Sequence, residues 1–339
     1  MTGATQRKSR SATADAARFL VTLLVLNLAS CSQVGLGLRF LGGTFQSVGS
    51  TPRPIKQRIT RPVRPHARLA ALWVGHATVL IQMDDKFILT DPVFTRAVGN
   101  LSVRLVEPGI LPEHLPQIDA VLISHLHFDH LSLGSLDLIE QKTKALFVPE
   151  GGLVYVPDSA VPPVELGTWE SHEKDGLRIT ATPVEHVGFR YGGDTSWMTK
   201  SFTGYVVEYN GQTIYFGGDT AISNWKFSAT ARRFSNIDLA LLPIAPIHPR
   251  EFMCKTHVDP AEALQLFRDL GARYMMAIHY DTFFNSLDEI GEAPRQLRAL
   301  LPQHGLTEED VAILEHGQQR VFRQQSSSGP PPSSELRGP

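Results

Sequence analysis

Cysteine is scarce in this sequence, and so is net charge. There are 2 cysteines among 339 residues, Cys31 and Cys254, which leaves no room for a disulfide framework. The 32 lysines and arginines nearly balance the 34 aspartates and glutamates, giving a formal net charge of −2 at pH 7. This balance argues against a polyanionic partner, so we expect no binding of nucleic acid.

Long hydrophobic runs are also missing near the N-terminus. The apolar stretch at residues 19–29 follows a segment rich in arginine and lysine and is too short to favour a transmembrane span. This pattern is typical of a secretory signal peptide, which we place at residues 1–31. Residues 28–31, Leu-Ala-Ser-Cys, resemble a bacterial lipoprotein box. We therefore predict lipidation of Cys31 and anchoring at a membrane surface of the bacterial cell envelope, with an unlipidated signal or a cytoplasmic location as alternatives.

Composition separates the two ends of the remaining chain from a central domain. Residues 32–67 are rich in glycine, arginine and proline and are predicted to form an extended tether. Residues 324–339 are rich in serine and proline and are predicted to be a disordered tail. No break in composition interrupts residues 68–323, which we expect to form one mixed α/β domain. Its helical windows lie at residues 135–142, 260–270 and 294–301.

The most informative segment is Ile-Ser-His-Leu-His-Phe-Asp-His at residues 123–130. It follows an apolar run that is predicted to be a buried strand, so the polar side chains lie in the loop at the end of that strand. His125 and His127 are two residues apart and leave an extended backbone on the same side. Asp129 and His130 can then turn toward a second ion. Because desolvating four such groups without a role is costly, the segment predicts a site for two metals.

Two metals need more ligands than one loop supplies, and the chain offers three more candidates. His186, Asp219 and His279 each follow a short apolar or β-rich run. A carboxylate can present one oxygen to each ion, so Asp219 is the best candidate to bridge two metals about 3.5 to 4 Å apart.

Six short motifs follow one another along the chain in an order that can be compared with known families. They are Trp-Val-Gly-His-Ala-Thr at 73–78, Leu-Thr-Asp-Pro at 89–92, His-Leu-His-Phe-Asp-His at 125–130, Phe-Gly-Gly-Asp-Thr at 216–220, His-Val-Asp-Pro at 257–260 and Ala-Ile-His at 277–279. Together they resemble the metallo-β-lactamase superfamily. In particular they are similar to the branch of N-acyl-phosphatidylethanolamine-hydrolysing phospholipases D and its bacterial relatives, which include sugar-lactone hydrolases. The resemblance covers roughly residues 68–322 and implies an α/β fold, the four-layer αββα sandwich.

The resemblance also implies a division of the ligands between two ions. One ion would be held by His125, His127 and His186, and the other by Asp129, His130 and His279, with Asp219 bridging. Asp129 would in addition be catalytic, orienting or deprotonating the attacking water.

His257 matches the catalytic histidine of the same family. There it would steady phosphate oxygens or protonate the leaving group. The alternative is structural, because Asp259 and Pro260 form a typical start for the helix at residues 260–270. On that interpretation His257 merely lies in the loop that leads into the helix.

Two further residues at strand ends, His76 and Asp91, are predicted to hold metal-binding imidazoles in place by hydrogen bonds. All predicted ligands are nitrogen or oxygen donors, a set that suits zinc but also admits manganese or iron. We therefore expect two divalent ions, with zinc favoured.

The resulting hypothesis is a phosphodiesterase of the phospholipase D type that releases N-acylethanolamine from N-acyl-phosphatidylethanolamine. The first alternative keeps the metal site and replaces the phosphodiester by a lactone or another ester. The second is a lipoprotein that binds metal without catalysis. Aromatic side chains that could line a groove for acyl chains are Trp197, Trp225, Phe252, Tyr280, Phe283 and Phe284. The sequence leaves the oligomeric state open.

Overall fold

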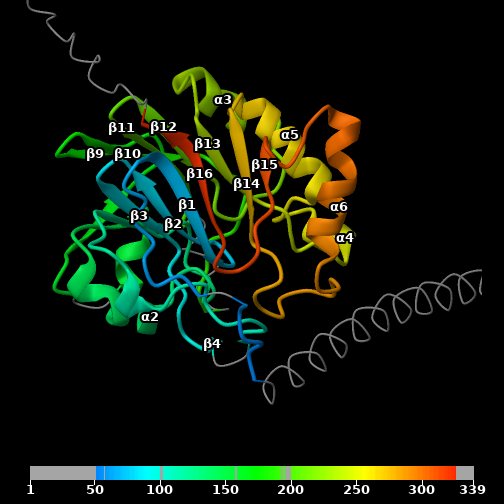
Figure 1. Cartoon of the computed structure of the whole chain (residues 1–339). Coiled ribbons are helices and arrows are strands. Elements are labelled where there is room, and N and C mark those ends of the chain that lie inside the picture. Colours follow the sequence, from blue (N-terminus) through cyan, green and yellow to red (C-terminus); the bar gives the residue numbers. More distant parts are fainter. Residues whose placement is uncertain are drawn as a thin grey trace, which may run out of the picture. The chain divides into compact units, whose positions relative to one another are not determined.

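Two seven-stranded sheets form the centre of the domain in the computed structural model, which describes residues 51–56, 58–99, 102–156, 159–191, 194 and 200–325 (Figure 1). The predicted signal peptide, Cys31, the first part of the predicted tether and the end of the predicted tail lie outside these residues.

The first sheet has the strand order β16-β1-β2-β3-β6-β7-β8. Neighbouring strands of this sheet are antiparallel from β16 to β3 and parallel from β3 to β8. The strands are β1 (Ala67–Gly75), β2 (Thr78–Met83), β3 (Lys86–Thr90), β6 (Ala120–Leu122), β7 (Leu146–Pro149), β8 (Pro163–Leu166) and β16 (Gln319–Gln324).

The second sheet has the order β15-β14-β13-β12-β11-β10-β9. It is antiparallel from β9 to β12 and parallel from β12 to β15. The strands are β9 (Ser171–Lys174), β10 (Leu177–Thr182), β11 (Gly204–Tyr209), β12 (Gln212–Phe216), β13 (Leu239–Pro243), β14 (Tyr274–Ile278) and β15 (Val311–Ala312), and a separate small hairpin joins β4 (Ala97–Val98) to β5 (Ser102–Val103).

Helices lie outside the two sheets (Figure 1). They are α2 (Leu133–Ile139), α3 (Lys226–Arg233), α4 (Arg250–Met253), α5 (Pro260–Leu270) and α6 (Glu292–Leu300), with 3-10 turns at Pro112–His114, Glu140–Lys142, Gly152–Tyr155 and Leu301–His304. Helix α5 packs on β13 and on both α3 and α6, whereas α2 covers the first sheet. The arrangement confirms the predicted αββα sandwich. No helix among the described residues is long and apolar enough to cross a membrane.

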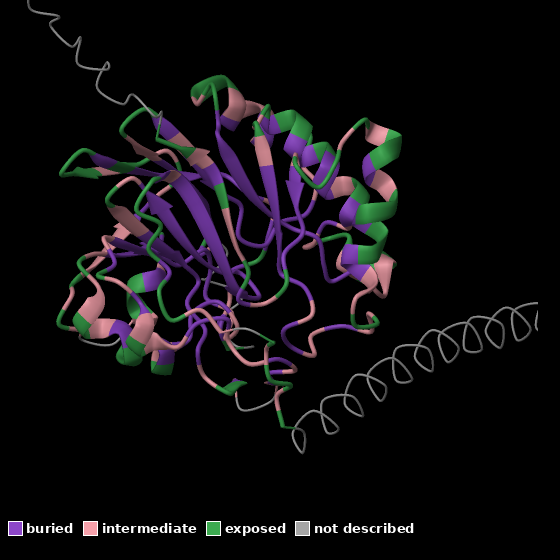
Figure 2. Cartoon of the chain, viewed as in Figure 1, coloured by how far each residue is buried: buried purple, intermediate pink, exposed green. Residues whose placement is uncertain are grey.

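The two faces of β1 pack against different layers of the sandwich. Trp73 and Ala71 belong to the large cluster that also contains residues of the second sheet. Leu72 and Val74 belong instead to the cluster that packs under α2. Because successive side chains of a strand point to opposite faces, a strand buried on both sides needs apolar residues at every position. Figure 2 shows most of both sheets as buried.

The described residues begin before the predicted domain and end after it. The backbone N–H of Arg53 donates to the carbonyl of Leu105 at 2.9 Å, and strand β1 starts at Ala67, within the predicted tether. At the other end, β16 runs to Gln324, and the N–H of Gln325 donates to the carbonyl of His66 at 2.9 Å. The described end of the predicted tether, residues 51–56 and 58–66, therefore lies along the domain.

Helix α5 has a complete capping box at its start. The Asp259 carboxylate accepts from the N–H of Glu262 at 2.9 Å, and the Glu262 carboxylate accepts from the N–H of Asp259 at 3.2 Å. We expect Asp259→Ala to lower the free energy of unfolding by about 1 kcal/mol, because a partly buried N–H group at the start of the helix loses its acceptor. Denaturant titration would measure it, with Asp269→Ala near the other end of α5 as the control. Equal stability of the two variants would contradict this role of the cap.

Candidate metal centre

The histidine-rich loop leaves the end of β6 and leads into α2. His125 and His130 are buried, with exposed fractions of 1% and 0%. Nε2 of His125 lies 2.8 Å from Nδ1 of His127, so the two imidazoles turn to the same side of the loop as their spacing predicts.

The three remaining candidate ligands come from the second sheet and meet this loop. His186 follows β10, Asp219 follows β12, and His279 follows β14. The oxygens of Asp219 lie 3.9 Å from Nε2 of His125, 3.3 Å from Nε2 of His130 and 3.1 Å from Nε2 of His279. Asp219 thus lies between His125 on one side and His130 and His279 on the other, which is the position that a bridging ligand requires.

A glycine allows this approach. Gly218 has a φ of +57°, and a Cβ on it would lie 2.4 Å from Cβ of Ser124, which precedes His125. A side chain at residue 218 would therefore push the Asp219 loop away from the histidine-rich loop.

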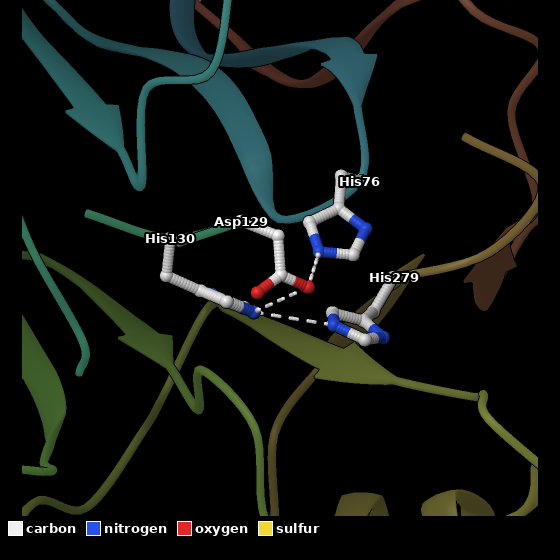
Figure 3. A group of neighbouring side chains, drawn as sticks. All are labelled: His76, Asp129, His130 and His279. Carbon is white, nitrogen blue, oxygen red and sulfur yellow. Dashed lines mark hydrogen bonds and ion pairs between the residues drawn. The ribbon is translucent and has the colours of Figure 1, made fainter. Parts of the chain in front are cut away.

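Five groups of side chains in the described chain have the proximity that an ion needs, and two of these groups contain six of the seven predicted ligands. In each, one ligand atom per residue lies within 4.8 Å of the others. The first group is His125, His127 and His186, and the second is His76, Asp129, His130 and His279, drawn in Figure 3.

Hydrogen bonds fix which nitrogen of several imidazoles faces inward. Nδ1 of His186 lies 2.9 Å from the carbonyl of Thr256, and Nδ1 of His279 lies 2.9 Å from the carbonyl of Ala245. Because a carbonyl oxygen only accepts, each Nδ1 must carry the hydrogen. In the neutral ring, Nε2 then keeps its lone pair and points into the cluster, which is the orientation that a metal ligand requires.

The unpaired atoms of the cluster support metal binding. Nε2 of His186 and Oδ1 of Asp219 are buried and have no hydrogen-bond partner. Burial lowers the pKa of His125 and of His186 well below the usual value for histidine, so both rings are neutral and able to donate a lone pair. Burying polar atoms of this kind without a partner is costly unless something occupies the space between them. The residues present therefore fit a divalent metal.

His130 differs from the other imidazoles. Burial opposes its charged form, but the carboxylates of Asp219, Asp91 and Asp129 hold its pKa well above the usual value. It therefore carries a proton on Nε2 when no metal is present, and binding of a metal at that nitrogen would release the proton.

Asp91 holds the His130 side chain through a hydrogen-bond network that includes Ser124. Its Oδ2 lies 2.6 Å from Nδ1 of His130 and accepts from Oγ of Ser124 at 2.6 Å. Its Oδ1 accepts from the N–H of Ser124 at 2.7 Å. The carboxylate is fully buried, so this network sets the orientation of both side chains.

His76 lies closer to the ligands than a purely supporting role demands. Its Nε2 is 3.0 Å from Oδ2 of Asp129, and its ring contacts that of His279 in a tilted arrangement, with centroids 3.9 Å apart (Figure 3). Its carbonyl accepts from the indole N–H of Trp73, and its N–H donates to Oγ1 of Thr282. Burial lowers its pKa to about 3, so the neutral ring holds the Asp129 carboxylate in one orientation.

Three residues of the centre sit in strained backbone conformations. His76, Asp91 and His279 have φ values of 56°, 32° and 69°. Residues other than glycine rarely adopt this left-handed region, at a cost of about 1–3 kcal/mol each. Each of the three directly follows a strand or lies at its end, so the surrounding sheets hold the turn that aims the side chain inward.

His257 lies both in the loop before α5 and beside the cluster. Its Nδ1 has no partner and is 3.6 Å from Oδ2 of Asp219, and burial lowers its pKa to about 4. The two interpretations of its sequence motif are therefore compatible in space, and kinetics must distinguish them.

Several residues that contact the centre could not be identified from the sequence. Ser124 and Thr282 donate to or accept from residues of the centre, and Arg190 bonds to the histidine-rich loop. Serine, threonine and arginine are too common for their positions to be informative without a fold.

The aromatic residues proposed to line a groove divide into two sets. Tyr280 and Phe283 are buried, with exposed fractions of 5% each, and both line pockets that open to solvent. Phe252 and Trp225 are exposed, at 61% and 55%. Trp197 lies outside the described residues. A cavity of about 200 Å³ adjoins the centre and is lined by His76, His279, Phe283 and Phe284, among others.

Comparison with known proteins identifies the family. The β-lactamase superfamily domain matches residues 86–280. An N-acyl-phosphatidylethanolamine-hydrolyzing phospholipase D of Caenorhabditis elegans is 31% identical over 67% of this chain and 68% of its own length. A metal-dependent hydrolase of Pelotomaculum thermopropionicum is 28% identical over 73% of this chain and 96% of its own length.

A solved structure shares the fold. The metallo hydrolase from the archaeon Ignicoccus hospitalis superposes with a TM-score of 0.55 at 19% identity, over 74% of this chain and 97% of its own. The sequence motifs, the paired sheets and the buried histidine–aspartate cluster agree with these matches. The chain therefore belongs to the β-lactamase superfamily and is a metal-dependent hydrolase with the metallo-β-lactamase sandwich fold.

Proposed function

We propose that this hydrolase binds two divalent ions and cleaves a phosphodiester bond of N-acyl-phosphatidylethanolamine, releasing N-acylethanolamine and phosphatidic acid. The observation that supports it most is the position of Asp219, within 3.9 Å of His125 on one side and within 3.3 Å of His130 and His279 on the other. The similarity to the phospholipase D of Caenorhabditis elegans supports this substrate.

The proposed ions are zinc, and they would be held by His125, His127 and His186, and by Asp129, His130 and His279, with Asp219 shared. Bound ions of this kind supply Lewis acidity and lower the pKa of water to near 7. The protein's own part is orientation. His76 holds the Asp129 carboxylate, with Nε2 and Oδ2 3.0 Å apart, so Asp129 can accept a proton from a water in one fixed direction.

His257 is proposed to act on the leaving side of the phosphodiester. Its unpartnered Nδ1 is directed to the same region as Asp219, where it can hydrogen-bond to a phosphate oxygen or to the departing oxygen.

Exposed apolar side chains near the ligand-bearing segments suit an amphiphilic substrate. Val187 follows His186 directly and is 40% exposed, Tyr191 is 55% exposed, and Phe252 in α4 is 61% exposed. Such side chains favour contact with lipid. Lipidation of Cys31 and anchoring in the cell envelope remain part of the proposal.

A substitution at His257 separates catalysis from a purely structural role. We expect His257→Gln to lower kcat about 10²-fold, because the glutamine amide can still donate a hydrogen bond but cannot transfer a proton to the leaving group. The metal content should stay unchanged, because His257 is outside the proposed ligand set. Steady-state kinetics with metal analysis by mass spectrometry would measure both. An unchanged kcat would leave His257 as a loop residue only.

Product analysis tests the function directly. Vesicles containing N-acyl-phosphatidylethanolamine are incubated with the zinc-loaded protein, and the products are identified by mass spectrometry. The proposal requires N-acylethanolamine and phosphatidic acid from the unchanged protein and neither product from Asp129→Asn.

A parallel assay with lactones and simple esters covers the main alternative. Turnover of those compounds by a protein that is inactive on the vesicles would move the assignment to carbonyl chemistry at the same centre. A folded, metal-loaded protein that is inactive on both classes would favour a role in metal binding alone.

A further inference from the structure

The side chain of a single arginine, Arg190, forms hydrogen bonds to both ends of the histidine-rich loop. Arg190 is 7% exposed, and its Nη1 donates to the carbonyl of Leu126 at 2.9 Å and to the carbonyl of Leu131 at 2.8 Å. These two carbonyls stand on either side of residues 127–130. One guanidinium nitrogen therefore sets the distance between the two ends of the segment that carries three of the candidate ligands.

The rest of the guanidinium is packed against the same loop. Its central carbon lies 4.3 Å from the centroid of the Phe128 ring, which suits a cation over an aromatic face. The neighbouring Phe189 ring packs edge-on against His127, with centroids 4.8 Å apart. The segment that contains Arg190 thus touches the side of the loop that bears His127.

Asp194 fixes the arginine's own backbone. Its Oδ2 accepts from the N–H of Arg190 at 3.1 Å, from the N–H of Tyr191 at 2.8 Å and from the hydroxyl of Tyr155 at 2.6 Å. With three donors on one oxygen, Asp194 holds the backbone N–H groups of Arg190 and Tyr191 in place.

Arg190 is also only four residues after His186, in the connection from β10 to β11. Its side chain therefore joins the segment with the His186 ligand to the loop with His125, His127, Asp129 and His130. Arginine suits this place better than lysine, because its planar, weakly hydrated guanidinium can be buried with several fixed donors.

We propose that Arg190 is a positioning residue of the metal centre, which sets the separation of the histidine-rich loop and His186 through the carbonyls of Leu126 and Leu131. This inference rests on the metal centre of the proposed function and not on the identity of its substrate. A centre whose ligands are held in place by outer partners binds metal more tightly, and loss of one such partner typically costs about 10- to 100-fold in affinity.

The test compares Arg190→Lys with Arg178→Lys. Arg178 lies on β10, where it pairs with Glu173 at 2.7 Å on the surface, so the control makes the same chemical change away from the centre. Zinc affinity is measured by competition with a chelator, and the ligand geometry is followed by the visible absorption of the cobalt-substituted full-length protein. We expect affinity to fall about 10- to 100-fold and the cobalt spectrum to change in Arg190→Lys only.

Unfolding of the metal-free proteins separates positioning from simple stabilisation. A purely structural role would lower the midpoint of unfolding of Arg190→Lys and leave the affinity and cobalt spectrum of the folded protein as in the unchanged chain, which would overturn the proposal. If Arg190→Lys does not fold, Asp194→Asn replaces it, and unchanged affinity and spectrum in that variant would overturn the proposal equally. None of these measurements uses a substrate, so an inactive enzyme would leave the result on Arg190 standing.

Discussion

Asp219→Asn should reduce hydrolysis about 10⁴-fold or more and leave fewer metal ions bound to each chain. Both carboxylate oxygens are used, with Oδ2 at 3.3 Å from His130 and Oδ1 at 3.1 Å from His279. An amide keeps the shape but loses the negative charge, and it can present only one oxygen. Two cations held near each other need an anionic ligand between them, because their mutual repulsion is otherwise uncompensated.

Metal analysis after gel filtration and a rate assay measure this effect. The matched control is Asp238→Asn. Asp238 is similarly buried, at 8% exposed against 3% for Asp219, but it precedes β13 and bonds to the N–H of Thr213 and to Arg323. The control tests the general cost of removing a buried carboxylate. Retention of full metal content and of activity within tenfold by Asp219→Asn would rule out a bridging role.

Asp91→Asn is expected to produce the second-largest effect, a loss of activity of about 10³- to 10⁴-fold. Oδ1 of Asp91 faces the N–H of Ser124, a group that can only donate, so the amide oxygen must take that place. The new NH₂ group then faces Nδ1 of His130, where the carboxylate Oδ2 accepted before. To accept from the amide, His130 must move its hydrogen to Nε2, the nitrogen that faces the cluster. The substitution thereby removes the lone pair that a metal needs.

The effect on metal binding should appear together with the loss of rate. We expect zinc affinity to fall by about 10- to 100-fold in a chelator competition assay. Asp119→Asn serves as the control, because Asp119 precedes β6 at the end opposite the histidine-rich loop, where its carboxylate accepts from the N–H of Phe87. Zinc affinity in Asp91→Asn equal to that of the control would show that the orientation of His130 is set elsewhere.

Local signals explain which helices were predicted correctly. The predicted helix at residues 260–270 coincides with α5, because residues next to each end of the helix carry the signals for its start and its end. Asp259, Pro260 and Glu262 define the start, and Gly271, with a φ of +60°, ends the helix.

Helices α6 and α3 show the opposite case, because local signals did not predict where they begin. Helix α6 begins at Glu292, two residues before the predicted window, because its N-cap is Gly291 in a left-handed conformation without a side-chain cap. Pro294 suggested a first helical position but lies inside the first turn. Helix α3 was not predicted, since its N-cap is Trp225, which carries no capping signal.

The histidine-rich loop and the motifs around it determined the family, the fold class and the type of donor atom from sequence alone. Within residues 125–130 the spacing of the side chains is local, so a short extended segment suffices to bring His125 and His127 to one side. The tertiary structure decided everything that depends on contact between the two sheets. This includes the position of Asp219 between the histidines, the contact of the His76 ring with the His279 ring and the bond from Arg190 across the loop.

The physical reason lies in the distance along the chain. His76 and His279 are more than 200 residues apart, yet the centroids of their rings lie 3.9 Å apart, and both have left-handed backbones that an isolated peptide would avoid. No local preference favours these conformations. They persist because two packed sheets fix the strand ends on either side, and that packing is a property of the whole domain.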